Sequence, residues 1–168
     1  MDLEDAITVF DVEKSESELV WNCIDTESES ELSRAAELFY QASKGDPRSD
    51  TGEDTLGFLK AMIEEKVTVQ APERLQIGMH GNDPVAVLAL KAYPSDGWST
   101  IYYLGVLPAF RRRGFGVAAM LQAFLSLKGM GGKTYHDGTA SGNVAARTLF
   151  ARLGQPPFRI MEEWILKK

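Results

Sequence analysis

Leu104-Gly105-Val106-Leu107-Pro108-Ala109-Phe110-Arg111-Arg112-Arg113-Gly114-Phe115-Gly116-Val117 is the stretch that decides how the rest of the chain is interpreted. An apolar run over residues 100–107 predicts a strand that Pro108 ends, because proline cannot donate a hydrogen bond to a ladder. Three arginines follow in a short loop, and two glycines then begin a helix predicted over residues 114–128. A helix start attracts anions, glycine allows close approach, and guanidinium groups bind phosphate oxygens. Arginine triplets are often only solvated surface, but this order predicts a cradle for a pyrophosphate.

The segments on either side predict an α/β sheet. Strands are predicted over residues 7–12 (Ile7-Thr8-Val9-Phe10-Asp11-Val12), 75–80, 85–90, 100–107, 133–137 and 158–166. Helices are predicted from near Ser28, which has capping-box spacing to Glu31, then around residues 58–63, over 114–128 and over 143–153. Residues 13–27 are ambiguous. The order is β-α-α-β-β-β-α-β-α-β, with an antiparallel early sheet and parallel pairing around the long helix.

Length and composition exclude several classes of protein. With 168 residues the chain is expected to form one domain, residues 1–168, and its 44% apolar content excludes global disorder. A single cysteine, Cys23, excludes an internal disulfide, and no apolar run is long enough for a membrane helix. The acidic start does not resemble a signal peptide, so a cytoplasmic location is expected.

Charge is divided unevenly between the two halves of the chain. Residues 1–92 hold eight basic and 20 acidic residues, whereas residues 93–168 hold ten and four, so the halves carry net charges of −12 and +6. The basic half is expected to attract a compact polyphosphate. Nucleic acid is a poor candidate, because the whole chain is acidic at −6 and aromatic residues do not alternate with basic ones. No metal site is expected, because the two histidines and the cysteine lie far apart in the sequence.

Two short matches to nucleotide-binding patterns fail on their context. Residues 114–119 fit G-x-G-x-x-A, but residues 108–113 separate the first glycine from the strand, and too few residues follow for a doubly wound domain. A nicotinamide-dependent oxidoreductase is therefore the weaker alternative. Gly132-Lys133-Thr134 resembles half of a P-loop, but Leu127 occupies the position of its first glycine.

Two motifs resemble the GNAT superfamily of acyl-CoA-dependent N-acyltransferases. Val106-x-Pro108-x-x-Arg111-x-x-Gly114-x-Gly116 is similar to the family's acyl-CoA signature, and Asn143-x-x-Ala146-x-x-Leu149-Phe150-x-x-x-Gly154 is similar to its second motif. The resemblance implies a mixed sheet that splays between its fourth and fifth strands. It also implies acetyl-CoA as co-substrate and direct attack of an amine on the thioester.

The same resemblance implies a role for each matching position. Backbone groups of Leu104, Gly105 and Val106 would bind the pantetheine arm, and the Val106 N–H would stabilise the oxyanion. The turn Arg111-Arg112-Arg113-Gly114-Phe115-Gly116 would bind the pyrophosphate. Asn143 would bind the cofactor near its thiol, although asparagine is also a good helix N-cap, and Phe150 would lie beside it.

The catalytic residues are where the sequence departs from this family. Phe150 stands where many members carry a tyrosine that protonates the leaving thiolate. Thr100 and Tyr102 stand where many carry a glutamate or histidine base on the fourth strand. Tyr102 and His136 are the catalytic candidates, with Tyr103, Tyr135 and Asp137 nearby. Asp137 is better interpreted as a residue that ties down the following loop through an Asx-type turn.

The resemblance therefore implies an N-acetyltransferase that moves an acetyl or short acyl group from acetyl-CoA to a primary amine. The acceptor is expected to be a small molecule ahead of a protein amino group, and exposed strand edges favour a homodimer. A non-catalytic acyl-CoA binding or sensing module is the alternative, because Phe150 has no proton to donate.

Overall fold

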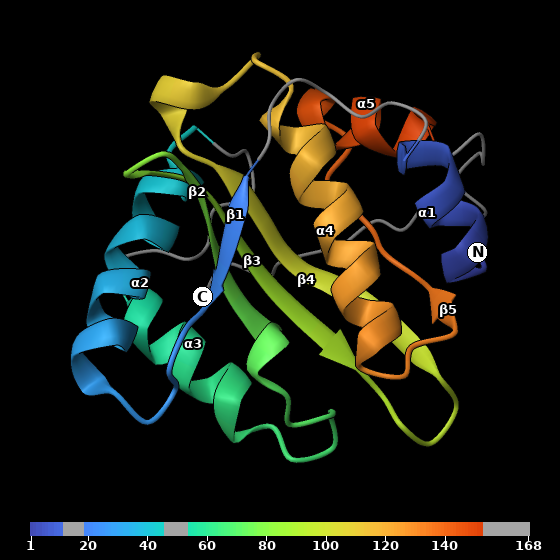
Figure 1. Cartoon of the computed structure of the whole chain (residues 1–168), viewed down its shortest axis with the longest axis horizontal. Helices are drawn as coiled ribbons and strands as arrows, with labels where there is room; N and C mark the ends of the chain where they lie inside the picture. Colours follow the sequence, from blue (N-terminus) through green and yellow to red (C-terminus); the bar gives the residue numbers. More distant parts are fainter. Residues whose placement is uncertain (12–18, 46–53, 153–168) are drawn as a thin grey trace, which may run out of the picture.

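The sheet forms the centre of the protein. The computed structural model describes residues 1–11, 19–45 and 54–152. Five strands pair in the order β1-β2-β3-β4-β5 (Figure 1). They are β1 (Val20–Cys23), β2 (Leu75–His80), β3 (Asp83–Ala92), β4 (Trp98–Val106) and β5 (Thr134–Tyr135). The first four are antiparallel and β5 is parallel to β4, which confirms the predicted α/β class and its mixed sheet.

Helices cover both faces of this sheet. They are α1 (Leu3–Asp11), α2 (Glu29–Ser43), α3 (Thr55–Glu64), α4 (Phe115–Gly129) and α5 (Val144–Arg152), with 3-10 turns at Pro72–Arg74 and Pro108–Phe110. One core cluster joins α2 and α3 to one face, and a second joins α1 and α4 to the other. The Ser28 side chain accepts the Glu31 N–H at 3.4 Å and so caps α2, as its sequence spacing predicted.

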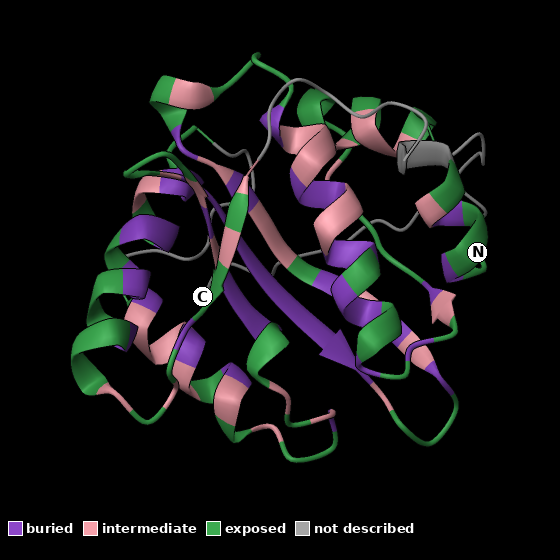
Figure 2. Ribbon diagram, viewed as in Figure 1, coloured by how far each residue is buried: buried purple, intermediate pink, exposed green. Residues whose placement is uncertain are grey.

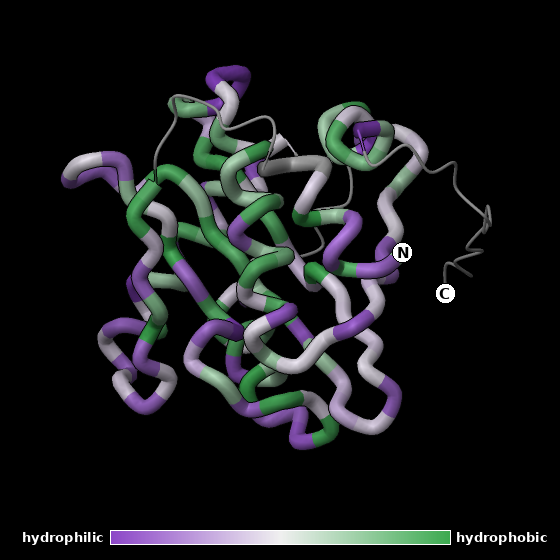
Figure 3. The backbone as a smooth tube through the Cα atoms, turned by 45° about the vertical axis from the view of Figure 1, so that its right-hand side comes forward, coloured by the Kyte–Doolittle hydropathy of each residue, from purple (hydrophilic) through white to green (hydrophobic). Residues whose placement is uncertain are grey.

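Strand β3 separates the two clusters, and residues 85–92 are buried throughout (Figure 2). Val87 and Ala89 face α2 and α3, whereas Val85, Leu88 and Leu90 face α4. In Figure 3 the hydrophobic segments gather in the middle of the molecule and the hydrophilic ones lie at its outer turns. A central strand that is buried on both faces has a continuous apolar sequence, which is why the sequence predicted a strand over residues 85–90.

The start of the chain differs from the prediction. Ile7–Val12 was predicted as a strand, but residues 3–11 form the helix α1, so that prediction is wrong. Leu3 and Ala6 are buried against α4, and Glu4 pairs with Lys128 of α4 at 2.5 Å. Spacing of three residues between buried positions is helical, and packing on α4 overrides the β preference of the local residues.

The first strand lies in the ambiguous stretch instead. β1 forms at Val20–Cys23, within residues 13–27, and pairs with β2. From β1 to α5 the element order is β-α-α-β-β-β-α-β-α, which matches the predicted order up to that point. The predicted strand over residues 158–166 and the predicted helix end at Gly154 lie outside the described residues.

Strand β4 carries a bulge in its middle. Its register with β3 shifts between Ala89 and Leu90: Tyr103 is opposite Ala89 and Ile101 is opposite Leu90, so Tyr102 is the extra residue. Tyr102 and Tyr103 consequently both meet residues of the α2 and α3 side, Phe58 and Phe39 respectively. Two neighbouring aromatic rings therefore stand on the same face of the sheet.

The last two strands part soon after they meet. β5 pairs with β4 only at Trp98–Thr134 and Ser99–Tyr135, although β4 continues to Val106. The outer edge of β5 is covered by the first residues of the chain, with Leu3 N–H donating to Lys133 O at 3.1 Å and Tyr135 N–H to Met1 O at 2.8 Å. The predicted splay between the fourth and fifth strands is confirmed.

Candidate active site

A pocket of about 560 Å³ occupies this splay. Its walls are the second half of β4, the turn after it, the first turn of α4, the end of β5 and one face of α5. The sequence-predicted residues among its lining are Tyr102, Leu104, Gly105, Val106, Arg111, Arg112, Gly114, Gly116, Asn143 and Phe150. Segments more than 40 residues apart in the sequence thus meet around one cavity.

The backbone of β4 turns hydrogen-bonding groups toward the open side of the splay. Leu107 N–H donates to Val85 O at 2.9 Å, which makes Leu107–Val85 a hydrogen-bonded pair of the antiparallel ladder. Such pairs alternate along the strands, so the N–H and C=O of Val106, and of Leu104 two residues earlier, point away from β3. We call this open edge of β4, from Leu104 to Val106, the slot. It is suited to pair with an extended ligand.

Arg111 is engaged by the protein itself. Its Nε donates to Val106 O and its Nη2 to Ala42 O, both at 2.9 Å. The guanidinium therefore fastens the turn after β4 to the strand and to the end of α2. Because two of its nitrogens already have carbonyl partners, Arg111 shapes the turn, and less of its donor capacity is available to a ligand than the sequence predicted.

The other two arginines of the turn are exposed, and they differ in position. Arg112 lines the pocket and has φ 63°, in the left-handed region that few non-glycine residues adopt. Arg113 lies over the rings of Phe110 and Phe115, with its Cζ at 5.6 and 5.8 Å from their centroids. Cationic groups thus border the helix start, where the residues of the motif predicted them.

The helix α4 begins without a side-chain cap. Its N-cap residue is Gly114, at φ 87°, and glycine offers no side-chain oxygen to the first N–H groups. Phe115 follows and is buried against Phe110 and His80, with ring centroids at 6.1 and 5.5 Å. Uncapped N–H groups at the positive end of a 15-residue helix are suited to bind an anion.

Two glycines beside the pocket have different reasons for lacking a side chain. A Cβ on Gly105 would stand 2.8 Å from the Ala42 Cβ, so close packing against α2 excludes one. A Cβ on Gly116 would meet nothing nearer than Leu149 Cδ1 at 3.6 Å, an ordinary contact. The fold therefore leaves room at Gly116, inside the pocket, and packing alone does not require glycine there.

The helix α5 contributes an amide and a phenyl ring. Asn143 Oδ1 accepts the Ala146 N–H at 3.1 Å, which confirms that Asn143 caps α5. This bond uses the carbonyl oxygen, and the residue also lines the pocket, so its amide nitrogen is the group that a cofactor role would require. Phe150 lines the pocket with an aromatic ring that carries no exchangeable proton.

Tyr102 packs against an aromatic ring and a buried lysine. Its ring stacks on Phe58 of α3 with centroids 5.3 Å apart and 7° between planes, and the Lys91 Nζ lies 3.5 Å from its centroid. Lys91 is buried and pairs with Glu65 at 2.5 Å. This hydrogen bond from Lys91 holds the pKa of Glu65 below its ordinary value. The arrangement fixes the position of Tyr102 at the α3 side of the pocket.

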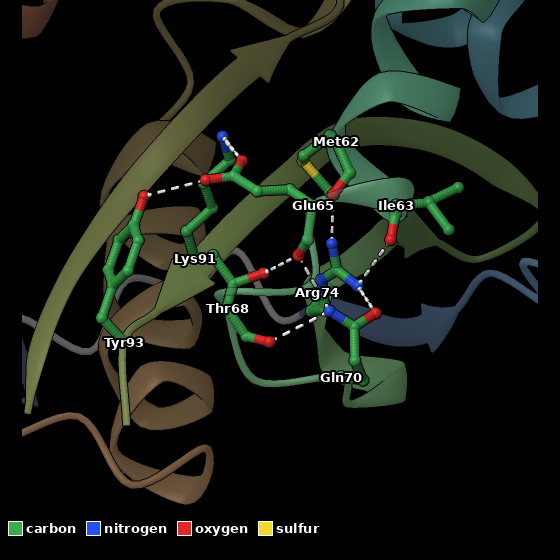
Figure 4. Close-up of polar contacts among 8 residues, drawn as sticks. All are labelled: Met62, Ile63, Glu65, Thr68, Gln70, Arg74, Lys91 and Tyr93. Atoms are coloured by element: carbon green, nitrogen blue, oxygen red, sulfur yellow. Dashed lines mark hydrogen bonds and ion pairs between the residues drawn. The ribbon is translucent and has the colours of Figure 1, made fainter. Parts of the chain in front are cut away.

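Figure 4 shows how this support continues into the fold. Arg74, which is buried, donates to the carbonyl oxygens of Met62 and Ile63 at the end of α3 and to the side chain of Gln70. Glu65, just beyond the helix, reaches Lys91 of β3 and Tyr93. The end of α3 is thereby fixed to the sheet beneath Tyr102.

The two residues that flank the end of β5 have opposite placements. His136 is exposed, its ring lies 6.0 Å from that of Trp98, and it is not among the residues that line the pocket. Asp137 lines the pocket and accepts hydrogen bonds from Tyr135 OH at 2.8 Å and from Gly138 N–H at 2.7 Å. Of the two, only Asp137 faces the cavity.

The pKa values of Asp137 and Tyr135 are both shifted by their surroundings. Partial burial of the carboxyl group raises the pKa of Asp137 to about 6, and the hydrogen bonds from Tyr135 and Gly138 offset only part of that rise. The same desolvation, with the neighbouring carboxylate, raises the pKa of Tyr135, which therefore stays a proton donor. The sequence suggested that Asp137 ties down the loop that follows it; its place in the pocket depends on the fold.

Neither a metal site nor a membrane segment is present within residues 1–11, 19–45 and 54–152. In this part of the chain no three His, Cys, Asp or Glu side chains gather where they could hold a metal ion. No helix there has the length and apolar character needed to cross a membrane.

Comparison with known proteins identifies the family. Residues 30–155 match the model of the Acetyltransferase (GNAT) family, and the chain belongs to this family. Among curated protein sequences none matches this chain. The family is the one that the two sequence motifs indicated.

Solved structures share the fold at low sequence identity. The ribosomal-protein-S18-alanine N-acetyltransferase from Escherichia coli has 17% identity and a TM-score of 0.59, with 82% of this chain and 77% of that one covered. AAC(6')-Iy, in complex with the bisubstrate analogue CoA-S-monomethyl-acetylneamine, has 14% identity and a TM-score of 0.64, with 90% and 100% covered. An acetyltransferase of Bacillus subtilis in complex with CoA has 19% identity and a TM-score of 0.56, with 82% and 76% covered.

Proposed function

We propose that this chain transfers an acetyl or short acyl group from acyl-CoA to a primary amine, which attacks the thioester directly. The observation that carries the proposal is the slot, which leads to the uncapped start of α4 within one pocket. An extended pantetheine arm would pair with the slot, and the diphosphate would meet the N–H groups around Gly114 and Gly116. Arg112 would add charge to that end of the pocket.

The Val106 N–H is the proposed oxyanion donor. It points into the splay by the alternation of the β3–β4 ladder, and Arg111 holds the carbonyl of the same residue. A donor fixed in this way costs no reorganisation when negative charge develops on the thioester oxygen. Attack of any amine on a thioester passes through a tetrahedral oxyanion, so this stabilisation is needed whichever amine is the acceptor.

Tyr102 is the proposed acid–base residue of the two predicted. It lines the pocket, and 46% of its surface is exposed despite the contacts of its ring with Phe58 and Lys91. His136 has no place in this proposal, because its ring lies beside Trp98 on the outside. A water bound beside Tyr102 is an equally good carrier of the amine's proton to solvent.

The acceptor is proposed to be a primary amine of a small molecule, with a protein amino group second. The structural relatives support both classes, since one is named for an alanine of ribosomal protein S18 and another was solved with an acetylneamine analogue. The acidic surplus of residues 1–92 would draw a cationic amine toward the α2 and α3 side.

The test has a binding arm and a turnover arm. Calorimetric titration should detect CoA binding, with NADH as the matched negative. Steady release of thiol from acetyl-CoA should then depend on an amine, tested with polyamines, aminoglycosides and a peptide with a free N-terminus. Failure to bind CoA would refute the proposal.

A non-catalytic acyl-CoA sensor is the second candidate, and Phe150 favours it. Phe150 lines the pocket at the position where the family resemblance implies a tyrosine that protonates the leaving thiolate, and its ring has no proton to donate. Tight CoA binding with no turnover for any amine would select the sensor over the enzyme.

A further inference from the structure

Lys91 is a buried charge near the end of the central strand β3. It follows the apolar run of residues 85–90, and only 8% of its side chain is exposed. Burial of an ammonium group is unfavourable unless partners compensate it. The partners here are the Glu65 carboxylate, 2.5 Å from Nζ, and the ring of Tyr102, whose centroid lies 3.5 Å from the same nitrogen. The second contact joins Lys91 to the residue proposed for acid–base chemistry.

Tyr102 depends on such contacts more than its neighbours in β4 do. It is the extra residue of the bulge, so it has no cross-strand partner in β3 to set its direction. It is also 46% exposed, and an exposed tyrosine can adopt several rotamers. Lys91 stands opposite Thr100 in the ladder, which makes Tyr102, two residues further along β4, its diagonal neighbour. The sheet therefore brings the ammonium to the ring, and Phe58 of α3 stacks on the same ring.

The Lys91 ammonium is itself held in place by the residue that follows α3 (Figure 4). Glu65 Oε2 pairs with Lys91, and Glu65 Oε1 accepts a hydrogen bond from the Tyr93 hydroxyl at 3.4 Å. Both oxygens of this carboxylate are thus engaged. Glu65 directly follows α3, where the buried Arg74 donates to two carbonyl oxygens near the helix end. A lysine, which has a long flexible stem, is thereby confined to one place.

We propose that Lys91 is a positioning residue, whose ammonium group holds Tyr102 in the pocket wall for proton transfer, an inference that rests on the proposed function. A cation over the face of an aromatic ring is attracted by the ring, more strongly where water is excluded. A catalytic group that is already in place needs no search among rotamers when the amine attacks. Lys91 is not among the residues that line the pocket, so it acts through Tyr102 and not on a substrate.

The first test measures the orientation of Tyr102 by NMR in protein without ligand. Three-bond couplings across its χ1 torsion should have the values of a single rotamer in wild type and averaged values in Lys91→Leu. Leucine keeps the apolar first part of the side chain and ends before the ammonium position. The Glu65 side chain is 31% exposed, so the variant does not leave its charge fully buried. Averaged couplings in wild type, or single-rotamer couplings in the variant, would overturn the proposal.

The second test is a double-mutant cycle on amine-dependent release of thiol. We expect kcat of Lys91→Leu to fall by about fivefold to about 30-fold, as for the loss of a desolvated cation–π contact, while Kd for CoA stays within about twofold of wild type. Tyr102→Phe keeps the ring and lacks the hydroxyl. In that background the same substitution of Lys91 should change kcat by less than about twofold. A merely structural role would lower kcat by the same factor in both backgrounds, and this result would overturn the proposal.

Lys44→Leu is the matched control. The Lys44 Nζ lies 5.0 Å from the centroid of the Tyr40 ring, and neither residue lines this pocket. Its kcat should stay within about twofold of wild type, and equal falls in both lysine variants would overturn the proposal. If wild type releases no thiol with any amine, the proposed function fails, and the χ1 couplings still decide whether Lys91 orients Tyr102. If Tyr102→Phe retains the kcat of wild type, the acid–base role of Tyr102 fails and this proposal fails with it.

Discussion

Replacement of Gly116 by Ala should have opposite effects on stability and on ligand binding. The new Cβ would lie 3.6 Å from Leu149 Cδ1, an ordinary contact, and Gly116 has no left-handed backbone angle. Since alanine is the better helix former, we expect the free energy of unfolding to rise by about 0.5–1 kcal/mol. The same methyl group would stand where the diphosphate is proposed to contact the backbone.

The loss of binding can be estimated from one charge-assisted hydrogen bond. Such a bond is worth about 1.5–3 kcal/mol, so Kd for CoA should rise by about tenfold to about 150-fold. Gly116→Val, with a bulkier side chain, should bind more weakly still. Urea unfolding measures the first effect and calorimetric titration of CoA the second.

Gly129→Ala is the matched control at the other end of α4. A Cβ there meets no atom within 4 Å, so the substitution should be tolerated and leave CoA affinity unchanged. If both Gly116 variants bind CoA within about twofold of wild type, the diphosphate does not lie on this turn of the helix, and the proposed cradle is refuted.

The remaining predictions concern the turn, the missing acid and the titrating carboxylate. Arg111→Ala removes the donors to two carbonyls and should lower the free energy of unfolding, measured in urea, by about 1–3 kcal/mol. Arg112→Ala removes only an exposed charge and should leave this free energy unchanged. Equal stabilities of the two variants would show that the Arg111 hydrogen bonds do not stabilise the fold. Phe150→Tyr adds a hydroxyl to the pocket and should raise kcat for thiol release at unchanged KM; no rise means that another donor serves. Because the pKa of Asp137 is raised from 3.8 to about 6, the stability that its protonated form contributes is lost as pH rises through that window. Between about pH 4 and 6 the free energy of unfolding of wild type should therefore fall relative to that of Asp137→Asn as pH rises. Above this window the difference between the two proteins should be constant. A difference that is constant at every pH would refute the pKa shift.

The parts of the fold that the sequence predicted are those set by local chemistry. Pro108 ends β4, Gly114 begins α4, and Asn143 and Ser28 cap their helices, because each depends on neighbours within a few residues. The continuous apolar run of β3 is likewise a local pattern with one common interpretation. The family could be identified from sequence for the same reason, since its motif combines several of these local features.

The parts that the sequence could not predict depend on partners far along the chain. The helix α1 is decided by packing on α4, where Glu4 meets Lys128, although residues 7–10 have strand propensity. Tyr103 enters the site because the bulge at Tyr102 turns both side chains to one face, and a bulge exists only in the pairing with β3. Asp137 similarly lines the pocket only because the fold brings the end of β5 beside β4.

A single guanidinium connects opposite faces of the sheet. Through Arg111 the turn before α4 is bonded to Val106 O and to the carbonyl of Ala42 near the end of α2, which packs on the other face. The turn and the end of α2 are therefore joined through one side chain, and a displacement of either would strain or break a hydrogen bond to Arg111.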